Sequence, residues 1–210
     1  MKKVFVLVVL FVLPLVAYLF FASGVNNFGR LPILTESTNE IQVLGSEVQL
    51  QDKITILGFL GQNVDLRQTN ALNLNQKIYK RFYEFKDFQT VMLVPKGTEK
   101  AVENLTKELS ELVDISKWKF VFAEVDQIEK LFDGLGTNIT LEEDYGTPYV
   151  FIIDKNRNLR GRNNDDDEGI KYGFNTNSVA ELNNKMEDDV KIILAEYRLA
   201  LKKNNATRSK

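Results

Sequence analysis

The chain of 210 residues contains no cysteine and no histidine. The lack of cysteine removes the thiolate nucleophile, the disulfide bond and the sulfur ligands of soft metals. The lack of histidine removes the imidazole base and the nitrogen ligand that most protein metal sites use. Thiol redox chemistry and metal binding by thiolate or imidazole ligands are therefore excluded, and the fold must be held together by packing alone.

An excess of charge of either sign is also missing. The chain has 27 Lys and Arg against 29 Asp and Glu, which gives a net charge of −2. Proteins that bind nucleic acid need a concentrated positive field to neutralise phosphates. We therefore expect no nucleic-acid partner.

Long hydrophobic runs are absent except at the N-terminus, where residues 4–22 carry no charge. At 1.5 Å per residue a helix of this length spans about 28 Å, close to the ~30 Å hydrocarbon core of a bilayer. Residues 1–3 contain Lys2 and Lys3, which favour a cytoplasmic N-terminus. We expect a single-pass signal anchor in the inner (cytoplasmic) membrane with a periplasmic C-terminal domain. The alternative is a signal peptide cleaved near Ala22-Ser23-Gly24.

The remainder of the chain has the length of one domain. Residues 23–39 are polar and irregular and are expected to form an extracytoplasmic stalk, and residues 204–210 a disordered tail. The intervening residues 40–203 are enough for one well-filled core and too few for two typical domains.

Within the domain, short apolar runs alternate with amphipathic segments. The pattern predicts a three-layer α/β/α sandwich with parallel strands, helical crossovers and a terminal β-turn-β unit, for which a thioredoxin-like fold is the economical match. The expected elements are a hairpin over 41–50, strands over 54–60, 90–94, 119–125 and 148–153, and helices over 69–85, 98–112, 128–132 and 178–201. Ser178-Val179-Ala180-Glu181 predicts a capping box at the start of the last helix.

Four segments carry a resemblance to a known family. They are Phe28-Gly29-Arg30-Leu31-Pro32, Ile56-Leu57-Gly58-Phe59-Leu60, the segment from Gly146-Thr147-Pro148 to Asp154-Lys155, and Leu159-Arg160-Gly161 with the long helix behind it. From about Leu31 to Lys203 the chain resembles the Sco/SenC branch of the thioredoxin superfamily. The resemblance implies a membrane-tethered extracytoplasmic protein linked to copper delivery or thiol redox in cytochrome c oxidase assembly.

The chain departs from that family at the chemically active positions. The resemblance places Gln62 and Leu66 at the two positions of the family's C-x-x-x-C motif, and Gly146 at or beside the position of its histidine. Carboxamide and aliphatic groups cannot replace thiolates as copper(I) ligands or as attacking groups in disulfide exchange. We therefore expect a vacated active site, no cofactor and no enzymatic activity. Asp65 and Arg67 lie in the same loop, but no nucleophile accompanies them.

Thr147-Pro148 opens the strand that lies beside the redox loop in thioredoxin folds, where a cis proline shapes the substrate groove. A cis bond there predicts that a binding groove survives without its catalytic pair. The alternative is a trans proline at the start of a strand.

Two acidic loops are the remaining candidates. Asp165, Asp166, Asp167 and Glu168 form a possible oxygen-ligand site for calcium, without the alternating spacing of an EF-hand loop. The alternative is a solvated hairpin extension. Together with Glu142-Glu143-Asp144 this loop would attract a basic partner if both face one side.

The sequence thus favours a non-catalytic, membrane-anchored accessory or assembly factor with a protein partner in the cell envelope. Two alternatives remain open. One is a structural subunit or a ligand- or peptide-binding module of an envelope complex, and the other is a metal carrier that uses oxygen ligands.

Overall fold

The computed structural model describes residues 9–16, 18 and 29–208. Of the expected anchor, residues 4–22, the structure describes 9–16 and 18, which are helical. The other anchor residues lie outside the described part of the chain. Within the described part of the chain, no helix combines the length and the apolar character needed to cross a bilayer.

A mixed sheet forms the centre of the domain, with strand order β1-β6-β5-β2-β3-β4. Strands β2, β3 and β4 run parallel, whereas β5 is antiparallel to β2 and β6 is antiparallel to β5. The bounds are β1 Ile33–Thr35, β2 Ile54–Leu60, β3 Phe88–Pro95, β4 Trp118–Ala123, β5 Gly146–Ile153, β6 Leu159–Arg160 and β9 Phe174–Asn175. Strands β2 and β3 are buried on both faces, which explains their continuous apolar sequences.

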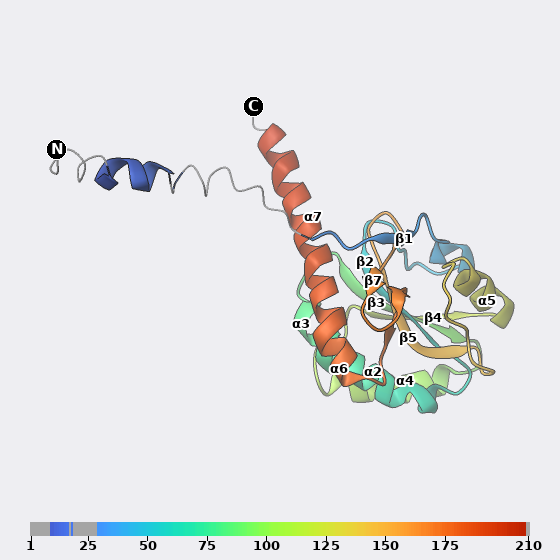
Figure 1. Ribbon diagram of the computed structural model, residues 1–210. Coiled ribbons are helices and arrows are strands. Elements are labelled where there is room, and N and C mark those ends of the chain that lie inside the picture. The colour runs from blue at the N-terminus through green and yellow to red at the C-terminus, as the bar shows by residue number, and fades with distance from the viewer. Residues whose placement is uncertain (1–8, 17, 19–28, 209–210) are drawn as a thin grey trace.

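Helices cover both faces of this sheet (Figure 1). One face carries α2 Gln68–Leu74, the π-helical turn Asn75–Tyr79, α3 Lys80–Phe82, α4 Glu99–Ser110, α6 Val179–Glu181, a second π-helical turn Leu182–Met186 and α7 Glu187–Arg208. The other face carries α5 Val125–Asp133 and the 3-10 helix Ile41–Leu44. Alternation along β2 supplies both cores, since Ile54 and Ile56 face the first layer while Leu57 and Phe59 face the second. The predicted α/β/α order is confirmed, and the topology is thioredoxin-like.

The expected hairpin over 41–50 is wrong. Residues 41–44 form a 3-10 helix that ends at Gly45, whose φ of 77° is left-handed. The Glu40 carboxylate accepts hydrogen bonds from the backbone N–H groups of Ile41, Leu50 and Gln51. Buried Ile41 and Leu50 then anchor a compact loop to the second core instead of pairing as strands.

The segments that flank the domain are more ordered than the sequence indicates. Strand β1 lies in the segment expected to be a stalk and pairs with β6, and Leu31 is buried. Helix α7 continues to Arg208, so helix covers 204–208 where we expected a disordered tail. Figure 1 shows α7 running past the sheet and continuing beyond it.

A small second sheet pairs β7 Arg162–Asp165 with β8 Gly169–Lys171. It contains the acidic loop Asp165–Glu168 at its turn. This hairpin lies over the start of the last helical segment, to which its acids and bases are bonded.

Candidate functional site

The positions expected to form a vacated active site, Gln62, Leu66 and Gly146, lie at the end of the sheet where β2 stops and β5 begins. Leu60, the last residue of β2, pairs with Gly146, the first residue of β5. Gln62 is exposed and donates its backbone N–H to the Asp144 carbonyl over 2.7 Å. Leu66 is 66% exposed and points away from the core. The structure therefore brings Gln62 and Gly146 together and places Leu66 at the rim.

Arg67 fills the site that these positions frame. It closes the 3-10 turn Val64–Arg67 that follows β2, and its side chain is 4% exposed. Val64 is buried under the turn, whereas Asp65 and Leu66 face solvent. The order of residues in the turn thus directs the guanidinium inward beneath the loop.

A four-bond network holds the Arg67 guanidinium. Its Nη1 and Nη2 donate to both oxygens of Asp144 at 2.5 and 2.8 Å, and Nη2 also donates to Glu142 Oε2 at 2.6 Å. Its Nη1 donates further to the Leu60 carbonyl at 3.0 Å. The fork-to-fork geometry with Asp144 is the arrangement that an arginine makes and a lysine cannot. Asp65, its neighbour in the loop, faces solvent, and Arg67 pairs instead with acids 75 and 77 residues away.

Two glycines make room for this network. An ideal Cβ on Gly146 would lie 2.5 Å from Arg67 Cζ and 2.7 Å from Nη1. Gly61 has a left-handed φ of 71°, and a Cβ there would lie 2.7 Å from both the carbonyl oxygen and Oδ2 of Asp144. A side chain at position 146 and the inward Arg67 therefore exclude each other.

Electrostatics favour the ionised form of the cluster. Burial raises the pKa of Asp144, but the hydrogen bonds and charge of Arg67, with the backbone N–H groups of Gly146 and Asn63, outweigh burial. The net pKa of Asp144 is lower than that of an ordinary aspartate. The loop is thus closed by a charged pair at neutral pH.

One buried atom of the network has no partner. Arg67 Nε makes no hydrogen bond, although the side chain is buried. Arg67 borders a cavity of about 10 Å³ that Asn70, Thr147 and Thr176 also line. That volume is about one water probe, so the cavity has no room for a substrate.

The donor set does not fit copper. Gln62 offers a carboxamide, Leu66 an aliphatic chain and Gly146 no side chain, and a guanidinium cation occupies the space between the strands. Copper(I) prefers soft thiolate or thioether ligands, and a fixed positive charge opposes any cation. The residues present therefore oppose copper binding at this site.

Pro148 lies inside β5 and its peptide bond is trans, as are all peptide bonds of the described residues. The cis alternative for Thr147-Pro148 is therefore wrong. A groove of about 380 Å³ nevertheless runs beside it. Its lining is mostly polar and consists of Asn138, Ile139, Thr140, Glu142, Thr147, Pro148, Tyr149 and Glu168. Glu142 and Glu168, one residue from each acidic loop, line this groove, whereas Asp144 bonds Arg67 and Asp165 bonds Lys185.

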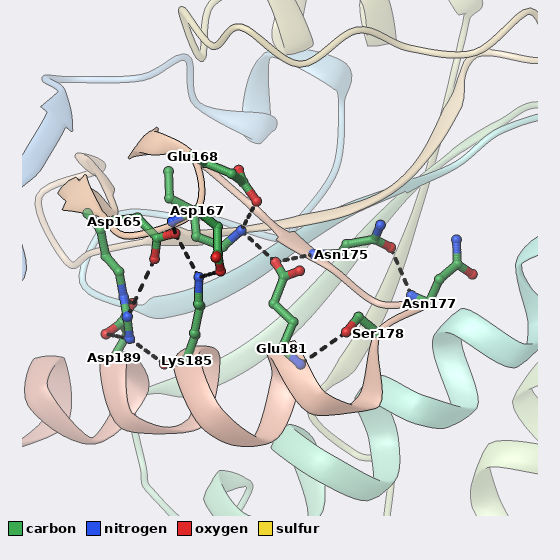
Figure 2. Close-up of polar contacts among 11 residues, drawn as sticks. Asp165, Asp167, Glu168, Asn175, Asn177, Ser178, Glu181, Lys185 and Asp189 are labelled. Atoms are coloured by element: carbon green, nitrogen blue, oxygen red, sulfur yellow. Dashed lines mark hydrogen bonds and ion pairs between the residues drawn. The ribbon is translucent and has the colours of Figure 1, made fainter.

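The acidic hairpin is neutralised by cations rather than open to a metal (Figure 2). Lys185 bonds Asp165 at 2.7 Å and Asp167 at 2.6 Å, and Arg162 bonds Asp189 at 2.8 Å. Among residues 9–16, 18 and 29–208 no three carboxylates are grouped so as to hold a metal ion. Asp165 and Asp167, two of the four acids that the calcium hypothesis requires, are instead held by Lys185 of the last helical segment, and Glu168 is held by Lys171 within the hairpin.

Sequence reasoning missed Lys171, which is fully buried at the centre of this network. Its Nζ bonds Glu168 Oε1 at 2.5 Å and Glu181 Oε1 at 2.7 Å. Burial lowers the pKa of Lys171, but these two carboxylates raise it above the ordinary lysine value. The polar hairpin sequence around Lys171 contains no periodic signal of burial, so pattern analysis could not find it.

Lys171 also changes the predicted cap. The Ser178 hydroxyl accepts the Glu181 N–H at 3.1 Å, as predicted. The Glu181 carboxylate does not return to the Ser178 N–H, because it bonds Lys171 and the Asn175 N–H instead (Figure 2). Half of the predicted capping box is therefore present.

Comparison with known proteins gives likeness of structure only. Neither a protein-family model nor a curated protein sequence matches the chain. Among solved structures, a proposed electron-transfer protein of Aquifex aeolicus matches with 19% identity and a TM-score of 0.49, over 79% of this chain and 98% of that one. A thiol:disulfide interchange protein of Chlorobium tepidum matches with 18% identity and a TM-score of 0.48, over 79% and 99%. Arabidopsis thaliana ScoI with copper bound matches with 17% identity and a TM-score of 0.44, over 70% and 91%.

The Chlorobium tepidum protein is described as a thioredoxin family protein. The thioredoxin-like topology of this chain rests on its own strand order. Identities below 25% and TM-scores below 0.5 extend to neither activity nor ligand. The function of this chain must therefore be argued from its own site.

Proposed function

We propose that this chain is a membrane-tethered, non-catalytic protein of thioredoxin-like fold that acts through a protein partner in the cell envelope. The observation that carries the proposal is the Arg67 guanidinium, which lies where a side chain on Gly146 would have to be. The apolar run at 4–22 supports the tether.

Chemistry at the occupied site supports a role without catalysis. Arginine stays protonated in proteins and serves neither as a base nor as a nucleophile. Asp144 has a lowered pKa, so it is a weak base at neutral pH. The site offers charge and shape to a partner but no group that forms or breaks a bond.

The four matching segments support a finer proposal, a place in respiratory oxidase biogenesis. The Sco/SenC resemblance spans Leu31 to Lys203 and implies that context. The similar structures include copper-bound ScoI of Arabidopsis thaliana and of Bradyrhizobium japonicum. With Gln62 and Leu66 in place of thiols, this chain would assist such a pathway as an accessory or assembly factor that carries no copper itself.

The experiment is cross-linking and affinity purification of the full chain from solubilised membranes. We expect an oxidase subunit or assembly component to be recovered, and Leu66→Asp at the rim of the site to reduce its yield several-fold. Leu112→Asp is the matched control, because Leu112 is 41% exposed after α4, outside the site. Recovery of no oxidase component contradicts the oxidase link. Equal yields from both variants contradict the use of this site.

A second function is favoured by the open groove beside Pro148. A groove of about 380 Å³ with polar walls suits an extended polar peptide better than an apolar ligand. In this alternative the chain is a peptide-binding or structural subunit of an envelope complex. Asn138→Ala, which changes an exposed part of the groove wall outside the Arg67 cavity, would then lower the yield of the partner, whereas Leu66→Asp would not.

A further inference from the structure

A second groove lies at the end of the sheet opposite the vacated site. It has a volume of about 280 Å³ and lies between α7, the segment before β3 and the turn after β5. Its lining consists of Ile54, Phe85, Lys86, Asp87, Lys155, Leu194, Tyr197 and Arg198. Ile54 begins β2 and Leu60 ends it, so about 20 Å of strand separate this groove from Arg67.

Large aromatic and aliphatic side chains are exposed to solvent at this groove. Phe85 is 45% exposed, and Leu199 on the adjoining turn of α7 is 38% exposed. Tyr197 is half-buried, with Lys155 Nζ 5.5 Å from its ring centre. Burial, with the nearby Asp154 charge, raises the pKa of Tyr197 to about 12, so the phenol stays neutral.

The groove is positively charged in a protein of net charge −2. Lys86, Lys155 and Arg198 line it against the single acid Asp87, which bonds Lys155. The positive charges of Lys53, Lys86 and Lys155 all lower the pKa of Asp87. Interfacial protein surfaces combine aromatic side chains with Lys and Arg in this way, because the rings enter the headgroup region while the cations attract anionic lipid.

The chain enters the domain beside this groove. The Leu31 carbonyl accepts a hydrogen bond from Arg160 Nε at 2.8 Å, and Arg160 Nη2 bonds Glu196 at 2.7 Å, one residue before Tyr197. Eight residues, 23–30, separate Ala22, the last residue of the apolar run, from Leu31. A chain of that length spans at most about 30 Å, so a tethered domain cannot move far from the bilayer.

We propose that the groove formed by Phe85, Tyr197 and the cations around them docks on an anionic membrane surface and directs the Arg67 end of the domain away from the bilayer. The proposal rests on the proposed membrane tether. Docking would orient the vacated site toward a partner that projects from the membrane. Each exposed cation near the lipid surface is expected to contribute about fivefold to the docked population at low salt.

The cysteine-free sequence makes the test direct, because one introduced cysteine gives a unique label. The full chain is labelled with an environment-sensitive fluorophore at Asn156→Cys, an exposed turn residue next to Lys155, or at Leu66→Cys at the opposite end. Each labelled protein is reconstituted into vesicles of phosphatidylcholine alone or of phosphatidylcholine with phosphatidylglycerol at 3:1. The vesicles contain lipids that carry a quencher at the headgroup.

We expect the probe at position 156 to be quenched several-fold more in anionic than in neutral vesicles, and the probe at position 66 to be unquenched in both. High salt and the double variant Lys86→Glu/Arg198→Glu should each abolish the difference. Lys100→Glu/Lys107→Glu, the same charge change on α4 outside the groove, should preserve it.

Three results would overturn the docking proposal. They are equal quenching of both probes, no dependence on anionic lipid, and protection of position 156 only in native membranes, which would assign the groove to a protein partner. Flotation separates this failure from failure of the tether. A chain that does not float with vesicles contradicts the membrane tether, whereas one that floats with an unquenched probe contradicts docking alone.

Discussion

Arg67 and Gly146 share one space: the guanidinium carbon lies 2.5 Å from the point where a Cβ on Gly146 would be. Arg67 is fixed there by Asp144, Glu142 and the Leu60 carbonyl. The relation links the missing side chain at position 146 to the charged cluster that closes the loop. A charged cluster centred on Arg67 thus fills the end of the sheet where β2 meets β5.

Gly146→Ala should destabilise the fold, because the new methyl group displaces a guanidinium that four hydrogen bonds hold in place. Overpacking of this kind costs about 1–3 kcal/mol. Urea unfolding of the full chain in detergent, followed by fluorescence of the single buried Trp118, measures the change. The matched control is Gly97→Ala: Gly97 meets no atom within 4 Å, although its φ of 95° adds strain of its own. In the Arg67→Ala background Gly146→Ala should cost much less than in the wild type, and an unchanged cost would contradict the shared space.

Arg67→Met should cost about 3 kcal/mol, at the lower end for a broken buried pair because Glu142 is largely exposed. The loss leaves Asp144 and the Leu60 carbonyl without their donor. Arg67→Lys should recover only part of it, since one ammonium cannot bond both oxygens of Asp144 and Glu142 in the same geometry. Urea unfolding followed by Trp118 fluorescence measures the free energy of unfolding of both variants. Full recovery by lysine would show that charge alone, and not the forked geometry, holds the loop.

Acid should weaken the closed loop through Asp144. Its pKa is lowered in the folded protein, so its contribution to stability is complete above the ordinary aspartate pKa of about 4 and is lost as the pH falls through the lower, folded-state pKa. The free energy of unfolding, measured between pH 6 and pH 2, should fall in that window. Asp144→Asn should be less stable at pH 6 and should lose less on acidification. A variant that keeps the full acid dependence of the wild type would assign that dependence to other carboxylates.

The polar hairpin over the last helix should depend more on Glu181 than on the helix cap. Ser178→Ala removes one cap hydrogen bond and should cost about 1 kcal/mol. Glu181→Gln removes a charge partner of fully buried Lys171 and should cost more, about 2 kcal/mol. Amide hydrogen exchange of 162–171 reports the hairpin directly. Faster exchange in Glu181→Gln than in Ser178→Ala is expected, and the reverse order would contradict a structural role for the Lys171 pair.

The buried strands could be predicted from sequence because burial on both faces leaves a direct record. Ile54–Leu60 and Phe88–Pro95 are almost wholly apolar, and few other structures accommodate such short runs. The segment 41–50 has the same apolar character at its ends, yet it forms a loop. Its structure depends on Glu40, whose three backbone hydrogen bonds follow from the folded geometry and not from any periodicity.

The sequence predicted that Gln62 and Gly146 lie close together, but not which side chain lies between them. The position of Gln62 after β2 and of Gly146 at the start of β5 follows from local patterns and the family resemblance. Arg67 in the loop and the acids at 142–144 were both visible, but nothing local pairs residues 75 and 77 apart. The sequence signal for the Arg67–Asp144 pair is the glycine at position 146, which leaves room for the arginine of the 62–67 loop.

A copper(I) titration of the purified full chain against a chromophoric chelator shows whether the site filled by Arg67 binds copper. We predict that the chain removes no copper from the chelator. We also predict that Gln62→Cys/Leu66→Cys/Gly146→His competes well only when Arg67→Ala accompanies it, because the guanidinium and a side chain at position 146 exclude each other. Tight stoichiometric binding by the unaltered chain would contradict the account.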